Sequence, residues 1–297
     1  MERIYKSVME DSNTDIINLI KSMCKNPDME ISVDNAENVI IHKAGKGKKI
    51  MISAIIPKIR VYISKINDNK AEFELSGDIE KMALLDKEIF CNGEMIGIVR
   101  ESRDKEKESK YFIEKIDDTE LKIGDVCTIE NKVKCKGDTL YGTGINSIIP
   151  LKITENLIIG TKYSVNDIYF ILSFSENSAK TAVNMIKPDY IYSIYCAETK
   201  DVFERGKGCG VVYKDGNAVV ADDVRSICEE TAHKNDIKTQ VYIGKQSPLP
   251  EIFGIIGKGA EVLGICIPTE KLKSACEVVG IEDMDCAVKL LSQIIAQ

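Results

Sequence analysis

The hydrophobic positions near the start of the chain change from a helical to an extended period. Between Asn13 and Cys24, apolar residues recur three and four positions apart, and Asp15 near the start suits the positive end of a helix dipole. A polar turn around Pro27 follows. Three short apolar segments come next, at Met29–Val33, Val39–His42 and Ile50–Ile56. The pattern predicts one helix and then three strands of a sheet.

The pattern changes twice more along the chain. From Ile59 to Gly142, short alternating segments are broken by Gly, Asn and Asp, which predicts a small β-barrel or sandwich. Beyond Gly144, strands and helices alternate, at Ile168–Phe174, Ala179–Met185 and Tyr190–Cys196. The last sixteen or so residues carry one apolar stripe and predict a helix that packs on a sheet.

Neither the first three strands nor the later α/β part has a balanced set of layers by itself. We therefore predict one α/β domain made of residues 1–58 and 143–297, interrupted by an inserted β-barrel at residues 59–142.

Composition and charge narrow the possible partners. The 297 residues are 44% hydrophobic and carry a formal net charge of -7, so no basic field is available for phosphate backbones or an anionic membrane surface. The N-terminal residues lack the apolar run of a signal peptide, and no stretch of about 18 apolar residues occurs. We expect a cytoplasmic protein that binds neither nucleic acid nor membrane.

Several segments resemble one family of enzymes. They are GKGKKIMISAII, GEMIGIV and LKIGDV, YGTGIN, DIYFILSFSEN, IKPDYIYSIY and IPTEKLKSACEVV. Together they resemble the TET-type, glutamyl and deblocking dinuclear-zinc aminopeptidases, some of which were labelled cellulases or endoglucanases. The resemblance extends from Lys46 to the C-terminus. It implies an α/β fold, with helices on both faces of a mixed sheet and an inserted barrel that serves in dimerisation or as a lid.

The resemblance also implies a metal centre. Members of that family hydrolyse N-terminal residues from peptides with two zinc or cobalt ions, held by two histidines and three carboxylates, and use a further Glu as general base. Carried onto this chain, the retained general-base position is Glu176. The former metal positions are Ile55, Asn146, Asn177, Tyr195 and Lys273.

These replacements do not suit a metal ion. Ile55 has no donor atom, a neutral Asn146 bridges two cations poorly, and a protonated Lys273 repels them. The chain contains only two histidines, His42 and His233, and neither lies at these positions. An alternative set of ligands stays open, because four candidate side chains fall near strand ends: Glu176, Asp189, Cys196 and Glu198. We also expect Glu176 and Lys273 to form an ion pair.

The leading hypothesis is a metal-free, non-catalytic homologue of the TET-type aminopeptidases that uses no cofactor. It would act as an assembly or regulatory subunit or as a peptide-binding protein, in a homo-oligomer or beside an active paralogue. The alternative is an active metal-dependent aminopeptidase or other hydrolase with non-standard ligands.

Overall fold

The computed structural model describes residues 13–24, 26–102, 110–116, 120–129, 133–161, 164–216, 218–245 and 259–297. Its main body is a twelve-stranded mixed sheet in which four neighbouring strands run parallel. These are β12 (Asp167–Ser173), β3 (Lys49–Ile55), β13 (Tyr190–Glu198) and β17 (Glu261–Glu270). Because parallel strands end at the same edge of a sheet, the residues that follow them meet there.

The remaining strands extend this parallel centre on both sides. On one side lie β2 (Val39–Lys43) and β1 (Met29–Val33), both antiparallel to their neighbours. On the other side the order continues through β18 (Glu277–Gly280), β11 (Thr139–Gly142) and β10 (Lys134–Lys136). A branch from β17 adds β14 (Cys209–Asp215), β15 (Ala218–Val219) and β16 (Thr239–Gly244).

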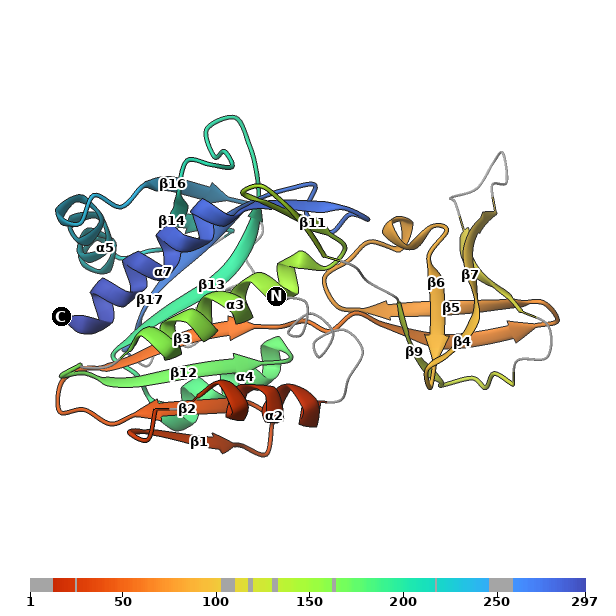
Figure 1. Ribbon diagram of the computed structural model, residues 1–297, viewed down its shortest axis with the longest axis horizontal. Helices are drawn as coiled ribbons and strands as arrows, with labels where there is room; N and C mark the ends of the chain where they lie inside the picture. The colour runs from red at the N-terminus through yellow and green to blue at the C-terminus, as the bar shows by residue number, and fades with distance from the viewer. Residues whose placement is uncertain are drawn as a thin grey trace.

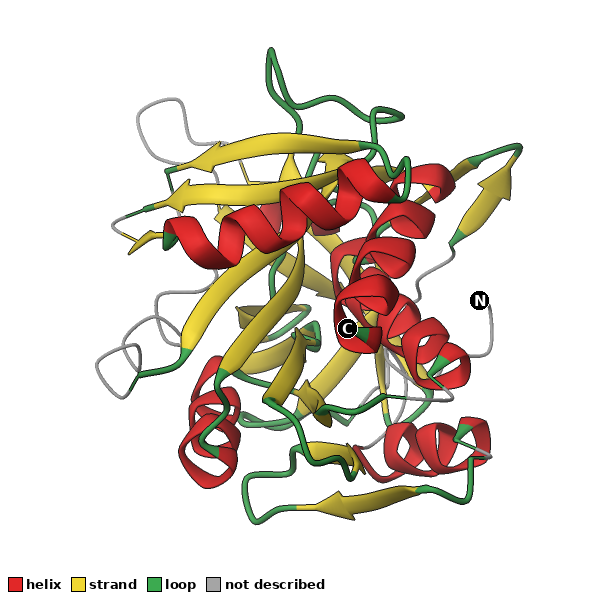
Figure 2. Ribbon diagram, turned by 90° about the vertical axis from the view of Figure 1, so that its left-hand side faces the viewer, coloured by secondary structure: helices red, strands yellow, loops and turns green. Residues whose placement is uncertain are grey.

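Helices cover both faces of the sheet, as the resemblance implied (Figure 2). Long helices α3 (Ile145–Gly160) and α7 (Ile281–Ala296) pack against each other, and α5 (Asp222–Lys234) joins α7. The helix α4 (Glu176–Ile186) contacts β12 and β3, and it lies behind the sheet in the view of Figure 1. A short helix, α2 (Asn13–Met23), begins the described chain. Within the described ranges no helix is long and apolar enough to cross a bilayer.

A closed six-stranded barrel projects from one end of this body (Figure 1). In the order of pairing its strands are β4 (Arg60–Asn67), β5 (Lys70–Ser76), β8 (Lys110–Lys115), β7 (Glu94–Ser102), β6 (Glu88–Cys91) and β9 (Val126–Ile129). A 3-10 turn, η1 (Lys81–Leu84), connects β5 to β6. The arrowheads of β3 and β12 point toward the barrel, so the carboxyl edge of the sheet faces it.

The predicted insertion and the observed barrel differ at one end. Residues 59–142 contain the six barrel strands and also β11, which pairs with β18 of the main sheet, and β10, which pairs with β11. Alternation along a strand does not reveal which sheet it joins, and this is why the sequence placed these strands in the barrel. The exact domain bounds stay a prediction.

Helix α3 is a long element that the hydrophobic pattern did not predict. Eleven of its residues are buried, including Asn146, Ser147 and Thr154, because β3, β13 and α7 surround it. A helix buried on all sides has no polar face and therefore no 3.6-residue period to detect. Pro150 lies inside it, which also argues against a helix when only the sequence is read.

Candidate functional site

A cavity of about 1220 Å³ lies at the carboxyl edge of the parallel strands, between the sheet and the barrel. The barrel contributes Tyr62, Ser76 and Val126 to its lining, while the main sheet contributes the ends of β3 and β13. All five positions to which the resemblance assigns metal ligands line it: Ile55, Asn146, Asn177, Tyr195 and Lys273. Residues that are far apart in the sequence therefore meet at the edge where α/β sheets commonly bind ligands.

Two of these side chains are held by the junction with the barrel. The Nζ atom of Lys273 lies 2.6 Å from Oδ1 of Asp78, in the loop after β5. The side-chain amide of Asn146 donates to the backbone oxygen and to Oδ2 of Asp78, at 3.0 and 3.2 Å. The backbone N–H of Glu80 also donates to the carbonyl of Lys273. Asp78 thus connects the barrel to both positions.

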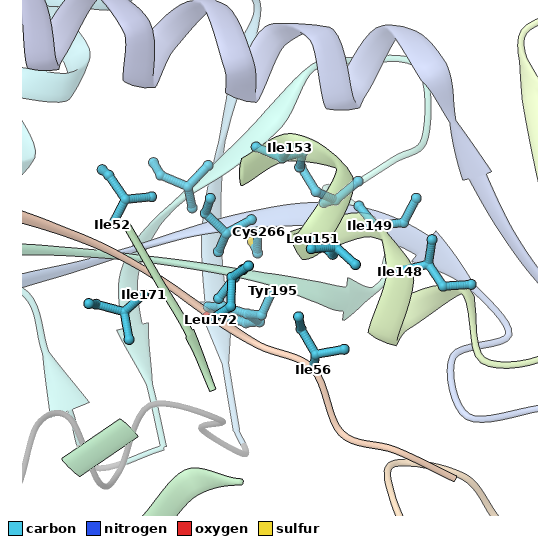
Figure 3. Close-up of a cluster of buried hydrophobic side chains, with 14 of the residues drawn as sticks. Ile52, Ile56, Ile148, Ile149, Leu151, Ile153, Ile171, Leu172, Tyr195 and Cys266 are labelled. Atoms are coloured by element: carbon cyan, nitrogen blue, oxygen red, sulfur yellow. The ribbon is translucent and has the colours of Figure 1, made fainter. Parts of the chain in front are cut away.

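A third lining side chain, Tyr195, is held by a hydrogen bond to a buried carboxylate. Its hydroxyl lies 3.0 Å from Oδ2 of Asp215 and donates to that fully buried carboxylate. Burial raises the pKa of Tyr195 well above its ordinary value. Figure 3 shows its ring near Ile56 and among isoleucine and leucine side chains from α3 and the sheet. The phenol is therefore a neutral hydrogen-bond donor in an apolar setting, and its oxygen is not available as an anionic ligand.

The remaining two positions differ in chemistry. Ile55 ends β3 with an apolar side chain, and Asn177 lies on the exposed first turn of α4. That helix begins at a capping box in which the Ser175 hydroxyl accepts from the N–H of Ser178. Glu176 is the first residue of α4, but its side chain lies outside what the structure describes. The expected pair between Glu176 and Lys273 stays a prediction, while the partner that Lys273 does have is Asp78.

A buried glutamate, Glu277, holds two of the backbone segments that line the cavity, and no role was predicted for it. Glu277 is fully buried and accepts the backbone N–H groups of Lys273 at 2.7 Å and Asn146 at 3.1 Å. Burial raises its pKa to about 7, against the opposing effect of those two hydrogen bonds. Its carboxylate accepts an N–H of the first turn of α3 and holds the turn that carries Lys273.

Of the proposed alternative ligands, Asp189 lies apart from the cavity that Cys196 and Glu198 line. Asp189 precedes β13 and accepts the N–H of Lys49, so it lies at the opposite edge of the sheet. At the cavity edge, the Glu198 carboxylate accepts the N–H groups of Lys271 and Leu272. Burial raises the pKa of Cys196, which keeps it a thiol. Across the described ranges, no group of three or more His, Cys, Asp and Glu could hold a metal ion.

The two histidines have other environments. His42 lies 2.7 Å from Oδ1 of Asp167 and stacks on Tyr169, at the end of the strands away from the cavity. His233 lies in the last turn of α5, where a basic side chain suits the helix dipole.

Comparison with known proteins identifies the family of this chain. The model of the M42 glutamyl aminopeptidase family matches residues 37–290. This chain belongs to that family. A protein of Acetivibrio thermocellus named "Putative aminopeptidase" is 28% identical over 290 residues, which cover 90% of this chain and 88% of the relative.

Solved structures share the fold of this M42 member. Aminopeptidase APDkam598 from Desulfurococcus kamchatkensis superimposes with a TM-score of 0.86 at 19% identity, over 96% of this chain and 90% of the other. The TET1 peptidase of Pyrococcus horikoshii, described as assembling into a tetrahedron or a large octahedral shell, gives 0.82 at 18% identity over 99% and 98%. The family and the fold class predicted from the sequence are thus confirmed.

The M42 resemblance implies a pair of metal ions at this cavity, and the residues present do not fit them. The five positions supply an alkyl chain, two neutral amides, a phenol and an ammonium. Zinc prefers thiolates, imidazoles and carboxylates. The Asn146 amide, the Tyr195 hydroxyl and the Lys273 ammonium are also already committed to carboxylates of the protein.

Proposed function

We propose that this M42 member has lost metal-dependent peptide hydrolysis and that its cavity binds a ligand without cleaving it. The observation that supports this most directly is the chemistry of the five side chains at the former metal positions, which line one cavity and include no imidazole and no carboxylate. An ammonium at Lys273 would add electrostatic repulsion to any cation placed there. Glu176, as the retained general-base position, would have no metal-activated water to deprotonate.

Metal content and turnover test this proposal together. The purified full chain is incubated with zinc or cobalt, desalted, and its metal content measured by mass spectrometry, while hydrolysis of aminoacyl anilides is followed in parallel. We expect less than stoichiometric metal and no turnover above a metal-only blank. Stoichiometric metal with robust turnover would instead establish the alternative, an aminopeptidase with non-standard ligands.

A control variant makes a negative result informative. The changes Ile55→His, Asn146→Asp, Asn177→Glu, Tyr195→Asp and Lys273→His restore the family's ligand types at all five positions. If the cavity keeps the family geometry, this variant gains zinc binding that the natural chain lacks, as measured in the same assay. Equal metal content in both proteins would show that the five positions do not decide metal binding. Circular dichroism checks that the variant is folded.

We further propose that the chain forms a homo-oligomer. The TET1 peptidase of similar fold assembles into closed shells. On the barrel of this chain, Met82 is 62% exposed and Ile123 69% exposed, and such apolar side chains suit a subunit interface. Size-exclusion chromatography with light scattering tests this, and a monomeric mass at micromolar concentration would rule it out. A partnership with an active paralogue, binding of peptides and a cytoplasmic location stay expectations from the sequence.

A further inference from the structure

The cavity wall carries an excess of positive charge that the chain as a whole does not have. The protein has a formal net charge of -7. Among the side chains that the structure describes, the cavity is nevertheless lined by five cations and by two carboxylates, Asp78 and Glu198. The cations are Lys58, Arg60, Lys200, Lys245 and Lys273. A concave, low-dielectric wall concentrates the field of such groups at its centre.

The two carboxylates are already engaged by the protein. Asp78 faces Lys273 at 2.6 Å, and Glu198 accepts two backbone N–H groups. A third carboxylate, Asp215, lies behind the wall and takes the hydroxyl of Tyr195. Asp78 is offset by Lys273, so on the side of the cavity formed by the ends of β13 and β16 two lysines, Lys200 and Lys245, stand against the single lining carboxylate that the structure describes there, Glu198.

Lys200, Tyr242 and Lys245 all line that side. The Nζ atom of Lys200 lies 5.7 Å from the centre of the Tyr242 ring, and Lys245 follows directly after β16 with an exposed side chain. Among the described side chains, no carboxylate forms an ion pair with either lysine. Elsewhere in the lining, the Nζ atom of Lys58 lies 5.1 Å from the centre of the Phe174 ring.

Cations beside aromatic rings suit a particular class of ligand. The ammonium groups bind anionic groups, while the rings of Phe174, Tyr195 and Tyr242 pack against an apolar or aromatic body. The volume of about 1220 Å³ is ample for such a molecule, since drug-sized ligands occupy pockets of about 300–1,000 Å³. A free amino terminus, which carries positive charge, is disfavoured by the same wall.

We infer that this cavity binds a small organic polyanion, a molecule with at least two phosphate or carboxylate groups on an apolar or aromatic body. The inference rests on the proposed function, because it takes the cavity to be a binding site free of metal ions. Lys200 and Lys245, on the side formed by the ends of β13 and β16, supply the charges that recognise the ligand.

Titration calorimetry on the full chain, in the presence of a chelator, tests the inference. The probes are adenosine diphosphate and pyrophosphate for the phosphate class, citrate and phthalate for the carboxylate class, and the neutral trialanine amide acetylated at its N-terminus as a blank. We expect a saturable heat with at least one polyanion and none with the blank. Raising the salt from 50 to 500 mM weakens binding about tenfold, because added ions screen the lysines. The class with the lower Kd identifies the anionic group.

Matched charge variants locate the site. The double variant Lys200→Glu with Lys245→Glu is expected to raise the Kd at least tenfold. The control, Lys136→Glu with Lys234→Glu, makes the same change in net charge on β10 and α5, outside the cavity, and leaves the Kd within about twofold. The milder pair Lys200→Gln with Lys245→Gln gives an intermediate loss if the reversal unfolds the chain.

The outcomes separate this inference from the proposed function. No binding by any polyanion, or an equal loss in the cavity and control variants, overturns the inference and leaves the absence of hydrolysis intact. Turnover of aminoacyl anilides with added zinc overturns the proposed function, whatever the calorimetry shows.

Discussion

The two edges of the parallel strands hold carboxylates in opposite electrostatic environments. At the amino edge, burial acts to raise the pKa of Asp167, but contacts with His42, the Gly45 N–H and Tyr169 outweigh it and hold the pKa below its ordinary value. At the carboxyl edge, burial dominates at Glu277 and raises its pKa to about 7. Hydrogen bonds thus stabilise the charge at one edge, whereas at the other edge the charge is costly.

The largest expected effect is a loss of stability as Glu277 ionises. Its pKa is higher in the folded chain than in the unfolded chain, so folding favours the protonated form. The contribution is present below about pH 4.5 and is lost as the pH rises to about 7, by as much as about 3 kcal/mol. Urea unfolding at pH 5, 6, 7 and 8 measures it. In Glu277→Gln the decline with pH shrinks, and an unchanged decline would contradict the assignment.

A smaller effect, with the opposite dependence on pH, is expected at the amino edge. Asp167→Ala removes the acceptor of three contacts and costs about 2 kcal/mol at pH 7. Because the folded pKa is lowered, this contribution is present above the unfolded pKa and disappears as the pH falls through the folded value. The control Asp189→Ala removes an acceptor of one backbone N–H and costs about 1 kcal/mol. Urea unfolding measures both variants, and an equal loss in the free energy of unfolding would contradict the larger contribution assigned to Asp167.

Tyr195→Phe tests how much a single hydrogen bond stabilises a second buried carboxylate at the carboxyl edge, Asp215. Burial raises the pKa of Asp215, an effect that the Tyr195 hydrogen bond and the charge of Lys200 only partly offset. Without the hydroxyl the buried carboxylate loses a donor, so we expect a loss of about 1.5 kcal/mol at pH 7. The matched change Tyr62→Phe, on a ring that is 40% exposed, is expected to be neutral. Thermal unfolding compares the two, and a neutral Tyr195→Phe would contradict this account.

Asp78→Ala has the smallest expected effect on stability and acts on the junction with the barrel. The ion pair with Lys273 is about 40% exposed on both sides, so its loss costs about 1 kcal/mol or less. The change also removes a carboxylate from the cavity wall, and a polyanion should then bind about threefold more tightly. Glu74→Ala breaks a comparable exposed pair with Lys81 on the barrel and leaves binding unchanged. Weaker binding in Asp78→Ala would contradict the charge argument.

Periodic patterns allowed much of the fold to be predicted. The predicted helix at 13–24 is α2, the three early strands are β1 to β3, and the C-terminal stripe is α7. The alternating segments of the insertion from β4 to β9 form the barrel. Each of these elements has one apolar and one polar side or a short apolar run, and that contrast can be read from the order of residues. Helix α3 lacks such a contrast and was missed.

The candidate site could be predicted only where the family resemblance supplied positions. Ile55, Asn146, Asn177, Tyr195 and Lys273 do line one cavity, whereas Asp78, Asp215 and Glu277 were not predicted. A single acidic residue forms no pattern. Its importance arises when folding brings it to the N-terminus of a helix or beside a distant lysine. The partner of Lys273 lies in the barrel, and no spacing in the sequence connects the two residues.

The position of β3 in the sheet has a consequence for how the chain folds. Both neighbours of β3, β12 and β13, follow the barrel in the sequence, and so does α3, which covers it. During synthesis, both edges of β3 therefore stay unpaired until the insertion and the strands after it have emerged. A barrel that folds first brings Ile55 and Asn146 together and shortens the loop that must be closed, which lowers the entropic barrier to pairing. Slow refolding is expected when the barrel is destabilised, even if the parallel strands are untouched.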